Sequence, residues 1–383
     1  MDAREPLFTR RFAALWAFAF VTFFSAFQLL PAIPFHILDL GGTKAQAGWF
    51  LAAYTFASAF AAPIMGSFAD HLGRKRMLVT ASLLFIGFSI AYGVITNLPL
   101  LFLVGTIHGA LWSAIMASSS ALMSEYIPES RRTQGLSYYG LSGNLAIAIA
   151  PAVGLWVYHF GWQVLCLEMA ILSAAMAVGA MLLQPVARAS LGRSPALREL
   201  WDWRVTRVAL TLTTIAIGYG GVTSYAAILA VERGIEPRSL YLSVFALTII
   251  LVRLLFSHLA DRLPTTTIVY PSLAMVPIAF GILAVAKTRT HFALSAALFG
   301  MAFGAMWPAF ISFILARTDP LRRARTFGSV VWAFDAGIGV GSLLIGSLGQ
   351  RYGLGTAFAV GAATSCLAIP IFAASSKGLK TTP

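Results

Sequence analysis

The chain has 383 residues, of which 58% are apolar and only 11% are charged. A soluble protein of this composition would leave large apolar patches in water, which excludes a soluble enzyme, a secreted disulfide scaffold and a disordered chain. The net charge of +13 is spread over short basic clusters between apolar runs, a pattern typical of a membrane protein and not of a nucleic-acid-binding one. The two cysteines lie far apart and no metal-ligand spacing occurs, so we expect no disulfide, metal or cofactor.

Twelve apolar runs are long enough to cross a membrane as helices. A transmembrane helix needs about 20 mostly apolar residues, and Gly and Pro are tolerated inside it where neighbouring helices satisfy the backbone. The sequence therefore predicts an all-α polytopic membrane protein with twelve spans, at 12–36, 46–68, 77–96, 99–124, 134–158, 162–184, 205–231, 239–259, 267–286, 292–315, 326–349 and 354–374.

The basic residues favour one orientation of these spans. If the N-terminus is cytoplasmic, 20 of the 27 lysines and arginines lie in cytoplasmic segments and 6 lie on the opposite side, while Arg253 lies inside a span. The positive-inside rule then predicts that both termini are cytoplasmic. We expect a multi-pass protein of the cell inner membrane whose surroundings are the lipid bilayer, with no nucleic-acid partner.

The two halves of the chain repeat each other. Because six spans is an even number, two six-helix copies share one orientation, so we expect parallel bundles at 1–184 and 204–383 joined by a polar cytoplasmic linker at 185–203. Transporters built from parallel repeats bind their substrate near the midplane between the repeats. Four matches recur in order at offsets of 191 to 193 residues: Ala69-Asp70 with Ala260-Asp261, Gly109 with Gly300, Pro128 with Pro320, and Arg132-Thr133 with Arg325-Thr326.

The loop between the second and third spans carries a motif, Gly66-x-x-x-Asp70-x-x-Gly73-Arg74-Lys75. It resembles the signature loop of the major facilitator superfamily, and the resemblance extends over essentially the whole chain. A carboxylate stabilises the N-terminus of a facing helix, and Arg and Lys form charge-assisted bonds that can hold two bundles together. The alternative is a solvated basic turn. The resemblance implies a cytoplasmic gating loop made of Gly66, Asp70, Gly73, Arg74 and Lys75, with Asp261 and Arg262 as the partial second copy.

Two further spans bear on the kind of transporter. Pro151 and Gly154 in the fifth span resemble the motif of drug/proton antiporters in this superfamily, which implies efflux; the alternative is an ordinary kinked helix. In the fourth span, Gly105 and His108 stand where the family often carries Arg and Gln. His108 can titrate near neutral pH and is a candidate for ion coupling, with a packing histidine as the alternative.

Ionisable residues inside the spans are functional candidates because a charge at mid-bilayer costs at least about 2.5 kcal/mol. Asp335 and Arg253 lie about 15 Å and 12 Å from the cytoplasmic ends of their spans at 1.5 Å per residue. One alternative is that the two residues form a structural ion pair. The other is that Asp335 binds a proton, while Arg253 either tunes Asp335 or binds an anionic group of the substrate. Glu168 lies in the sixth span, which the resemblance places outside the cavity, so we expect it to be structural.

Aromatic side chains with a few polar groups suit amphipathic or cationic organic molecules. The resemblance implies a central cavity, and its candidate lining residues are Gln28, Trp112, Tyr138, Asn144, Tyr225 and Trp307.

The sequence therefore predicts a secondary active transporter, and not an enzyme, that works by alternating access. We expect a monomer that exports small amphipathic organic molecules against a proton or sodium gradient, since no ATP-binding P-loop is present. The alternatives are a symporter or uniporter for a sugar or organic acid, or a flippase for a lipid-like molecule.

Overall fold

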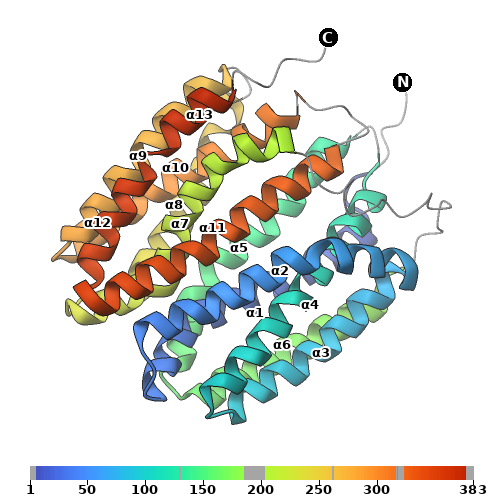
Figure 1. The fold of residues 1–383 in the computed structure, drawn as a ribbon. Helices are drawn as coiled ribbons and strands as arrows, with labels where there is room; N and C mark the ends of the chain where they lie inside the picture. The colour runs from blue at the N-terminus through green and yellow to red at the C-terminus, as the bar shows by residue number, and fades with distance from the viewer. Residues whose placement is uncertain are drawn as a thin grey trace. The chain divides into compact units, whose positions relative to one another are not determined.

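A computed structural model describes residues 6–128, 131–184, 203–260, 263–315, 317 and 323–376. Within these ranges the chain forms helices and no strands (Figure 1). Most of the predicted linker, together with Asp261 and Arg262, lies outside the described residues. The helices are α1 (Arg10–Asp39), α2 (Lys44–Leu72), α3 (Arg74–Val94), α4 (Leu98–Tyr126), α5 (Arg132–Tyr158), α6 (Trp162–Leu182), α7 (Trp203–Glu232), α8 (Leu240–Ala260), α9 (Thr265–Val285), α10 (Arg289–Leu315), α11 (Arg323–Tyr352), α12 (Leu354–Ser365) and α13 (Ala368–Ser376).

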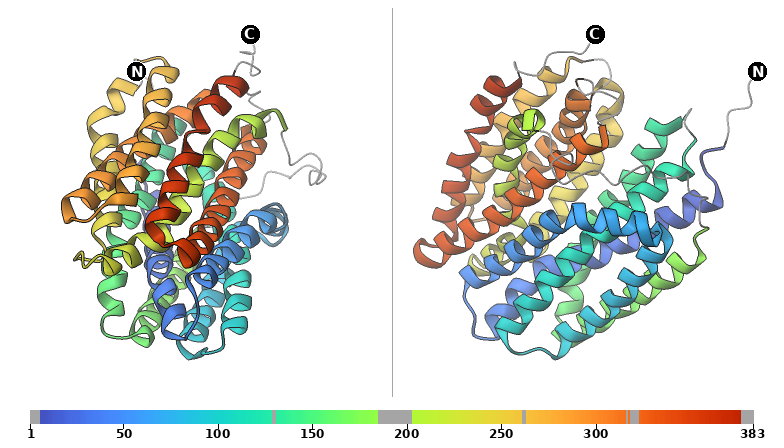
Figure 2. Two further views of the ribbon diagram at one scale, coloured as in Figure 1. Left: turned by 60° about the vertical axis from the view of Figure 1, so that its left-hand side comes forward. Right: turned by 45° about the vertical axis from the view of Figure 1, so that its right-hand side comes forward.

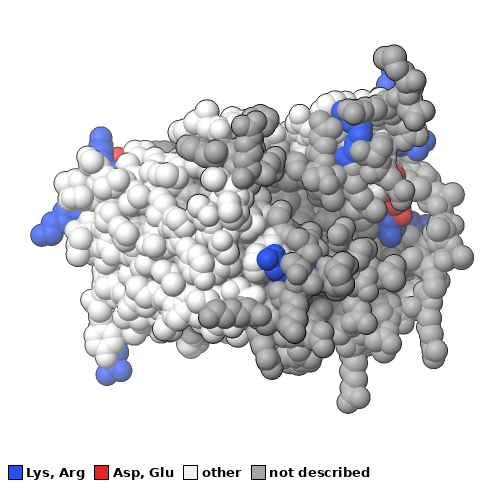
Figure 3. All heavy atoms as spheres, turned by 90° about the horizontal axis from the view of Figure 1, so that it is seen from above, with Lys and Arg blue, Asp and Glu red and all other residues white. Residues whose placement is uncertain are grey.

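The helices have the length and surface of membrane spans. Ten spans in the described residues are long and apolar enough to cross a membrane, and α8 contains a shorter apolar stretch, Leu240–Leu255. Their outer faces expose large apolar side chains such as Val94, Leu182 and Leu255. Most of the described surface in Figure 3 is uncharged. This surface suits lipid and confirms the predicted all-α polytopic membrane fold.

The last predicted span differs from a single helix. The run expected at 354–374 is divided into α12 and α13, with a turn at Cys366 and Leu367. Pro370 in the first turn of α13 has no backbone N–H and so cannot donate to the carbonyl of Cys366. At the turn, the amide of Leu367 donates to the carbonyl of Thr364 at 3.1 Å.

The described residues fall into two compact units, which we treat separately. The first consists of Met1–Leu29 and Phe60–Ser194, and the second of Leu30–Ala59 and Pro195–Pro383. The second unit therefore contains the turn between α1 and α2. The predicted division into bundles at 1–184 and 204–383 stays a prediction.

The first unit is built around α3, which packs against α4 and α6. Its core is formed by large apolar side chains of α1, α3, α4 and α6, including Phe12, Phe85 and Met176. Two aromatic polar groups anchor the ends of these helices. Trp162 Nε1 donates to the carbonyl of Tyr92 at 2.7 Å, and Tyr126 Oη donates to the carbonyl of Gln184 at 2.6 Å.

In the second unit α7 lies along α11, α10 packs against α8 and α9, and α12 packs against α9 (Figure 2). Small residues let the backbones of α7 and α11 approach closely, as is common in membrane helices. A Cβ atom at Gly341 would lie 1.9 Å from the carbonyl oxygen of Ile217, and one at Gly220 would lie 2.1 Å from that of Ile338. The α7–α11 pair therefore forms the centre of this unit.

The start of α2 packs against α7 and α11 in the second unit. We call the contacts of Lys44 and Gly48 described below the hairpin contact. Tyr225 Oη on α7 donates to the carbonyl of Lys44 at 2.7 Å, and the amide of Lys44 donates to Gln350 Oε1 on α11 at 3.1 Å. Lys44 Nζ pairs with Glu232. A Cβ atom at Gly48 would lie 2.3 Å from the carbonyl oxygen of Ser342. Hydrogen bonds, an ion pair and close backbones thus hold α2 against α7 and α11.

Arg233, just after α7, caps the C-terminal end of α9. Its guanidinium donates to the carbonyls of Leu283 at 2.9 Å and Ala284 at 2.7 Å, and also to that of Ala286. The last carbonyls of a helix have no partner within the helix, and a cation there is favourable. Arg233 therefore ties the α7–α8 connection to the end of α9.

We expect Arg233→Ala to lower the free energy of unfolding by about 2 kcal/mol or more, because charged hydrogen bonds are lost and carbonyls are left unpaired. Thermal unfolding of the purified protein in detergent measures this. Arg238→Ala is the matched control, because the Arg238 side chain is 46% exposed and its ion pair with Glu236 spans 3.7 Å. Equal destabilisation by both variants would contradict the assigned cap.

Candidate functional site

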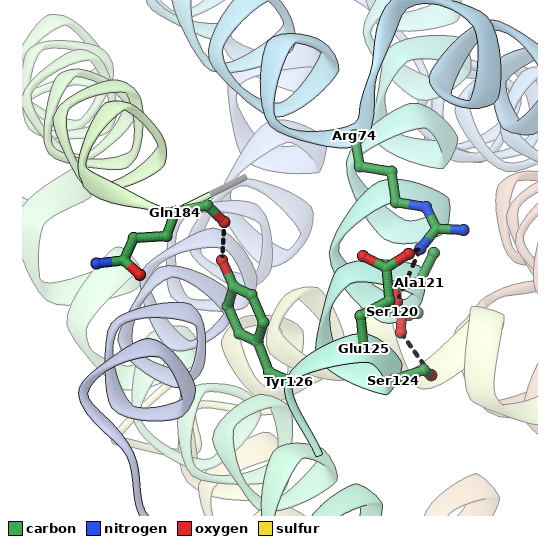
Figure 4. Close-up of polar contacts among 7 residues, drawn as sticks. All are labelled: Arg74, Ser120, Ala121, Ser124, Glu125, Tyr126 and Gln184. Atoms are coloured by element: carbon green, nitrogen blue, oxygen red, sulfur yellow. Dashed lines mark hydrogen bonds and ion pairs between the residues drawn. The ribbon is translucent and has the colours of Figure 1, made fainter. Parts of the chain in front are cut away.

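The loop between α2 and α3 is organised by Gly73 and Arg74. Gly73 precedes α3 with φ +95°, a conformation that glycine adopts easily. Arg74 reaches α4, where its guanidinium pairs with Glu125 and donates to the carbonyl of Ala121 at 3.3 Å (Figure 4). The first of the expected gating cations is thus bound to a carboxylate at the end of α4.

The structure describes the other predicted members of this loop only in part. The backbone around Gly66 leaves open space where a Cβ atom would stand, and Lys75 is half-buried. The side chain of Asp70 lies outside the described residues, as do Asp261 and Arg262. The role of the loop in gating stays a prediction.

An aromatic cluster occupies the second unit between α7, α8, α10 and α11. Tyr219 stacks on Phe303 with ring centroids 5.5 Å apart, and Trp307 meets Phe334 edge-on at 4.9 Å. Trp307 and Phe334 are only half-buried. We define the aromatic cluster as Tyr219, Phe245, Phe299, Phe303, Trp307 and Phe334.

Asp335 follows Phe334 of this cluster directly along α11. The Asp335 side chain is half-buried. Arg253 on α8 is also half-buried, and its Nε atom is buried without a hydrogen-bond partner in the described part of the chain. No ion pair joins Asp335 to Arg253 among the described residues. The structure therefore does not show the structural ion pair that the sequence left open.

His108 is packed inside the first unit. It is 3% exposed, its Nδ1 lies 3.0 Å from the Tyr92 hydroxyl, and its ring stacks on Phe88 at 5.2 Å. Phe85 meets the same ring edge-on at 4.3 Å. These surroundings fit a hydrogen-bonded packing histidine, and its role in ion coupling stays a prediction.

The predicted motif on α5 meets Gln28 of α1. A Cβ atom at Gly154 would lie 2.8 Å from Cα of Gln28, so the two backbones touch at this point. Pro151 lies one turn earlier within α5. Gln28 is fully buried and donates through Nε2 to Glu168 Oε1 of α6 at 3.3 Å. The structure thus connects the α5 motif to a carboxyl group that sequence analysis set aside as structural.

The remaining cavity candidates lie in different surroundings. Trp112 meets Phe23 edge-on with centroids 5.5 Å apart, and Tyr138 is 39% exposed. Tyr225 is fully buried and belongs to the hairpin contact. The Asn144 side chain lies outside the described residues. Of the six candidates, Trp307 alone belongs to the aromatic cluster.

Most residues of the aromatic cluster were not among the candidates from the sequence, although the spacing of its α10 members indicates that these share one face. Phe299, Phe303 and Trp307 recur every four residues, so they form one stripe along α10. Phe245 and Phe334 come from other helices, and nothing in the spacing of the sequence pairs them with this stripe.

Comparisons with known proteins agree with this fold. The fatty acid resistance protein FarB of Neisseria gonorrhoeae is 24% identical over 134 residues, which are 34% of this chain and 26% of FarB. The quinolone resistance protein NorA of Staphylococcus aureus is 24% identical over 135 residues, 35% of each chain. The matched stretches thus span about a third or less of the curated relatives' length.

Solved transporters share the overall fold. The crystal structure of the nucleoside transporter NupG has a TM-score of 0.76 at 15% identity, covering 96% of this chain and 99% of NupG. A transporter of the POT family, solved in complex with 5-aminolevulinic acid, has a TM-score of 0.80 at 14% identity, covering 97% of each chain. These identities show the fold and not the substrate.

A family sequence model matches most of the chain. The sequence model of the Major Facilitator Superfamily matches residues 15–341, which include the signature loop, the α5 motif and Asp335. Together with the all-α membrane fold, this confirms the predicted resemblance. The protein belongs to the major facilitator superfamily and is a multi-pass membrane transporter.

Proposed function

We propose that this transporter exports small amphipathic organic molecules in exchange for protons, by alternating access. The observation that carries the proposal is Asp335, an acid within a membrane helix that directly follows Phe334 of the aromatic cluster and forms no ion pair with any described base. An acid in such a position is favoured in its neutral form and can bind and release a proton. The ion that Asp335 binds is then H⁺, with Na⁺ as the alternative.

We infer the substrate class from the aromatic cluster of the second unit and from Arg253. Aromatic rings bind flat apolar molecules and attract cations over their faces. The buried Nε of Arg253 has no hydrogen-bond partner among the described residues, so Arg253 is available to an anionic substrate group. FarB and NorA, named for resistance to fatty acids and quinolones, support export of amphipathic compounds. These features favour an amphipathic organic substrate over a sugar, which needs more hydrogen-bonding side chains.

Alternating access requires contacts that form in one state and break in another. The hairpin contact is the group of polar contacts that we assign to this role, because it joins α2 to α7 and α11. The ion pair of Arg74 with Glu125 joins α3 to α4 within the first unit and holds the signature loop in place. The positive-inside bias supports an inner-membrane protein with both termini in the cytoplasm. The working unit is a monomer, and its energy source is an ion gradient; no chemical conversion of the substrate is part of the mechanism.

Everted membrane vesicles with a pH-sensitive dye test this function. Respiration acidifies the vesicles, and amphipathic drugs, fatty acids, sugars and organic acids are then added one at a time. We expect at least one amphipathic compound to release protons from vesicles that contain the protein and not from vesicles without it. Proton release by sugars alone would contradict the amphipathic substrate class and favour sugar export. Compound-driven ion movement that depends on Na⁺ and not on H⁺ would overturn proton coupling.

A further inference from the structure

The first unit contains an acid and an amide that leave two hydrogen-bond acceptors unused. Gln28 on α1 is fully buried, and its Nε2 donates to Glu168 Oε1 on α6 at 3.3 Å. The other oxygens of the two groups, Gln28 Oε1 and Glu168 Oε2, are also buried and have no hydrogen-bond partner among the residues that the structure describes. Leaving two buried acceptors without a donor is unfavourable.

Three helices fix the position of this pair. The close approach of α5 at Gly154, where a Cβ atom would lie 2.8 Å from both Cα and Cβ of Gln28, leaves the Gln28 backbone no room to move towards α5. On α6, the neighbouring Leu165 and Met169 are buried and hold the helix in the core. The amide and the carboxyl group therefore meet in a defined position within the membrane-spanning part of the unit.

Among the described residues, no base forms an ion pair with Glu168. Gln28 provides the side-chain hydrogen bond that the Glu168 carboxyl group accepts. An ionised carboxylate inside a membrane without a counter-charge is unstable, and it binds a proton readily. Within the first unit, titratable side chains of the neighbouring helices have other partners: the Tyr92 hydroxyl of α3 lies 3.0 Å from His108 Nδ1 of α4, and the Tyr139 hydroxyl of α5 donates to Ser119 Oγ.

We propose that Glu168 and Gln28 form a proton-binding site in the first unit, separate from Asp335. Binding transfers one proton from water to Glu168 Oε2. The new O–H donates to Gln28 Oε1 while Gln28 Nε2 continues to donate to Glu168 Oε1, so the acid and the amide pair through two hydrogen bonds and both unused oxygens gain a partner. Release returns the proton to water and restores the carboxylate.

This site joins two residues for which the sequence predicts separate roles. Gln28 is one of the expected cavity residues, whereas Glu168 is expected to be structural. The inference concerns proton occupancy without any substrate, so it goes beyond the proposed export function and does not depend on it.

Infrared difference spectroscopy of the full chain in liposomes tests the site directly. A protonated carboxylic acid has a carbonyl stretching band that a carboxylate lacks and that shifts in D₂O. We expect such a band to appear as the pH is lowered, to be absent in Glu168→Gln, and to persist in Asp335→Asn. A spectrum of Glu168→Gln identical to that of the unmodified protein would overturn the proposal.

A second pair of variants tests the partner amide. Gln28→Leu removes the acceptor of the acid proton, so we expect the Glu168 band to move to higher frequency. Gln163→Leu changes the same residue type at an exposed position of α6, five residues from Glu168, and should leave the band in place. A band that moves equally in both variants, or in neither, would overturn the acid–amide pair. No drug is added in these measurements, so a failure of the export assay leaves their outcome intact.

Discussion

Vesicles that contain Asp335→Asn are expected to lose compound-driven proton release while the protein still folds and reaches the membrane. Asparagine has nearly the same shape as aspartate but cannot release a proton at any accessible pH. Because a charge inside the bilayer costs about 2.5–3.5 kcal/mol on insertion scales, its replacement by a neutral amide should not lower stability. The dye signal in everted vesicles, normalised to the amount of protein, is the measurement.

The matched control for this variant is Glu236→Gln, which removes a carboxylate whose side chain is 60% exposed in the α7–α8 connection. It should retain the full dye signal. If Asp335→Asn responds to the same compounds with the same proton release as the unmodified chain, Asp335 has no part in coupling. The aromatic cluster would then bind substrate without Asp335 as the coupling acid.

Gly48→Ala is expected to weaken the hairpin contact and expose the α11 surface beneath it. A Cβ atom at this position would lie 2.3 Å from the carbonyl oxygen of Ser342 and 2.6 Å from the Tyr225 hydroxyl, distances at which α2 has to move. Overpacking of this kind costs about 1–3 kcal/mol, which corresponds to a shift of roughly fivefold or more in the equilibrium between contact and separation. Alternating access would then favour the state in which α2 and α11 are apart.

The labelling rate of a cysteine at position 55 measures this shift. Thr55 on α2 is buried, and its Oγ1 would lie 2.7 Å from a Cβ atom at Gly339 of α11, so a maleimide should react slowly with Thr55→Cys in a chain whose native Cys166 and Cys366 are replaced by alanine. Adding Gly48→Ala should accelerate the reaction roughly fivefold or more. Gly281→Ala is the matched control, because nothing lies within 4 Å of its Cβ position. Unchanged labelling with Gly48→Ala would mean that α2 tolerates the methyl group without leaving α11.

The order of the membrane helices was predictable from the sequence, because each predicted apolar run falls on a helix of the structure, or on two in the case of the last run. The ends of the helices were not predictable, because a helix continues past its apolar stretch. The apolar run at 46–68, for example, lies within α2, which extends from Lys44 to Leu72. Hydropathy marks the part of a helix that contacts lipid and does not mark where its backbone hydrogen bonds stop. The division of the last span at Cys366 was missed for the same reason, although Pro370 was visible.

The candidate site was predictable only in those parts that depend on a single helix. Asp335, Arg253 and Trp307 stand out because their residue types are unusual within a span. The contact of Glu168 with Gln28 depends on the directions of two side chains and on the close approach of α5 at Gly154. A sequence without an alignment carries no information on which faces of three helices meet, so Glu168 was assigned a structural role by family analogy.

The Arg233 cap has a practical consequence for structure determination by electron microscopy. A protein of this size needs a fused or bound marker domain for particle alignment, and short connections between helices are the usual insertion points. The connection from α9 to α10 is unsuitable, because the carbonyls of Ala284 and Ala286 are bound to Arg233. The α5–α6 connection exposes His159 and Phe160 to the outside and accepts an added domain without breaking a contact of this kind.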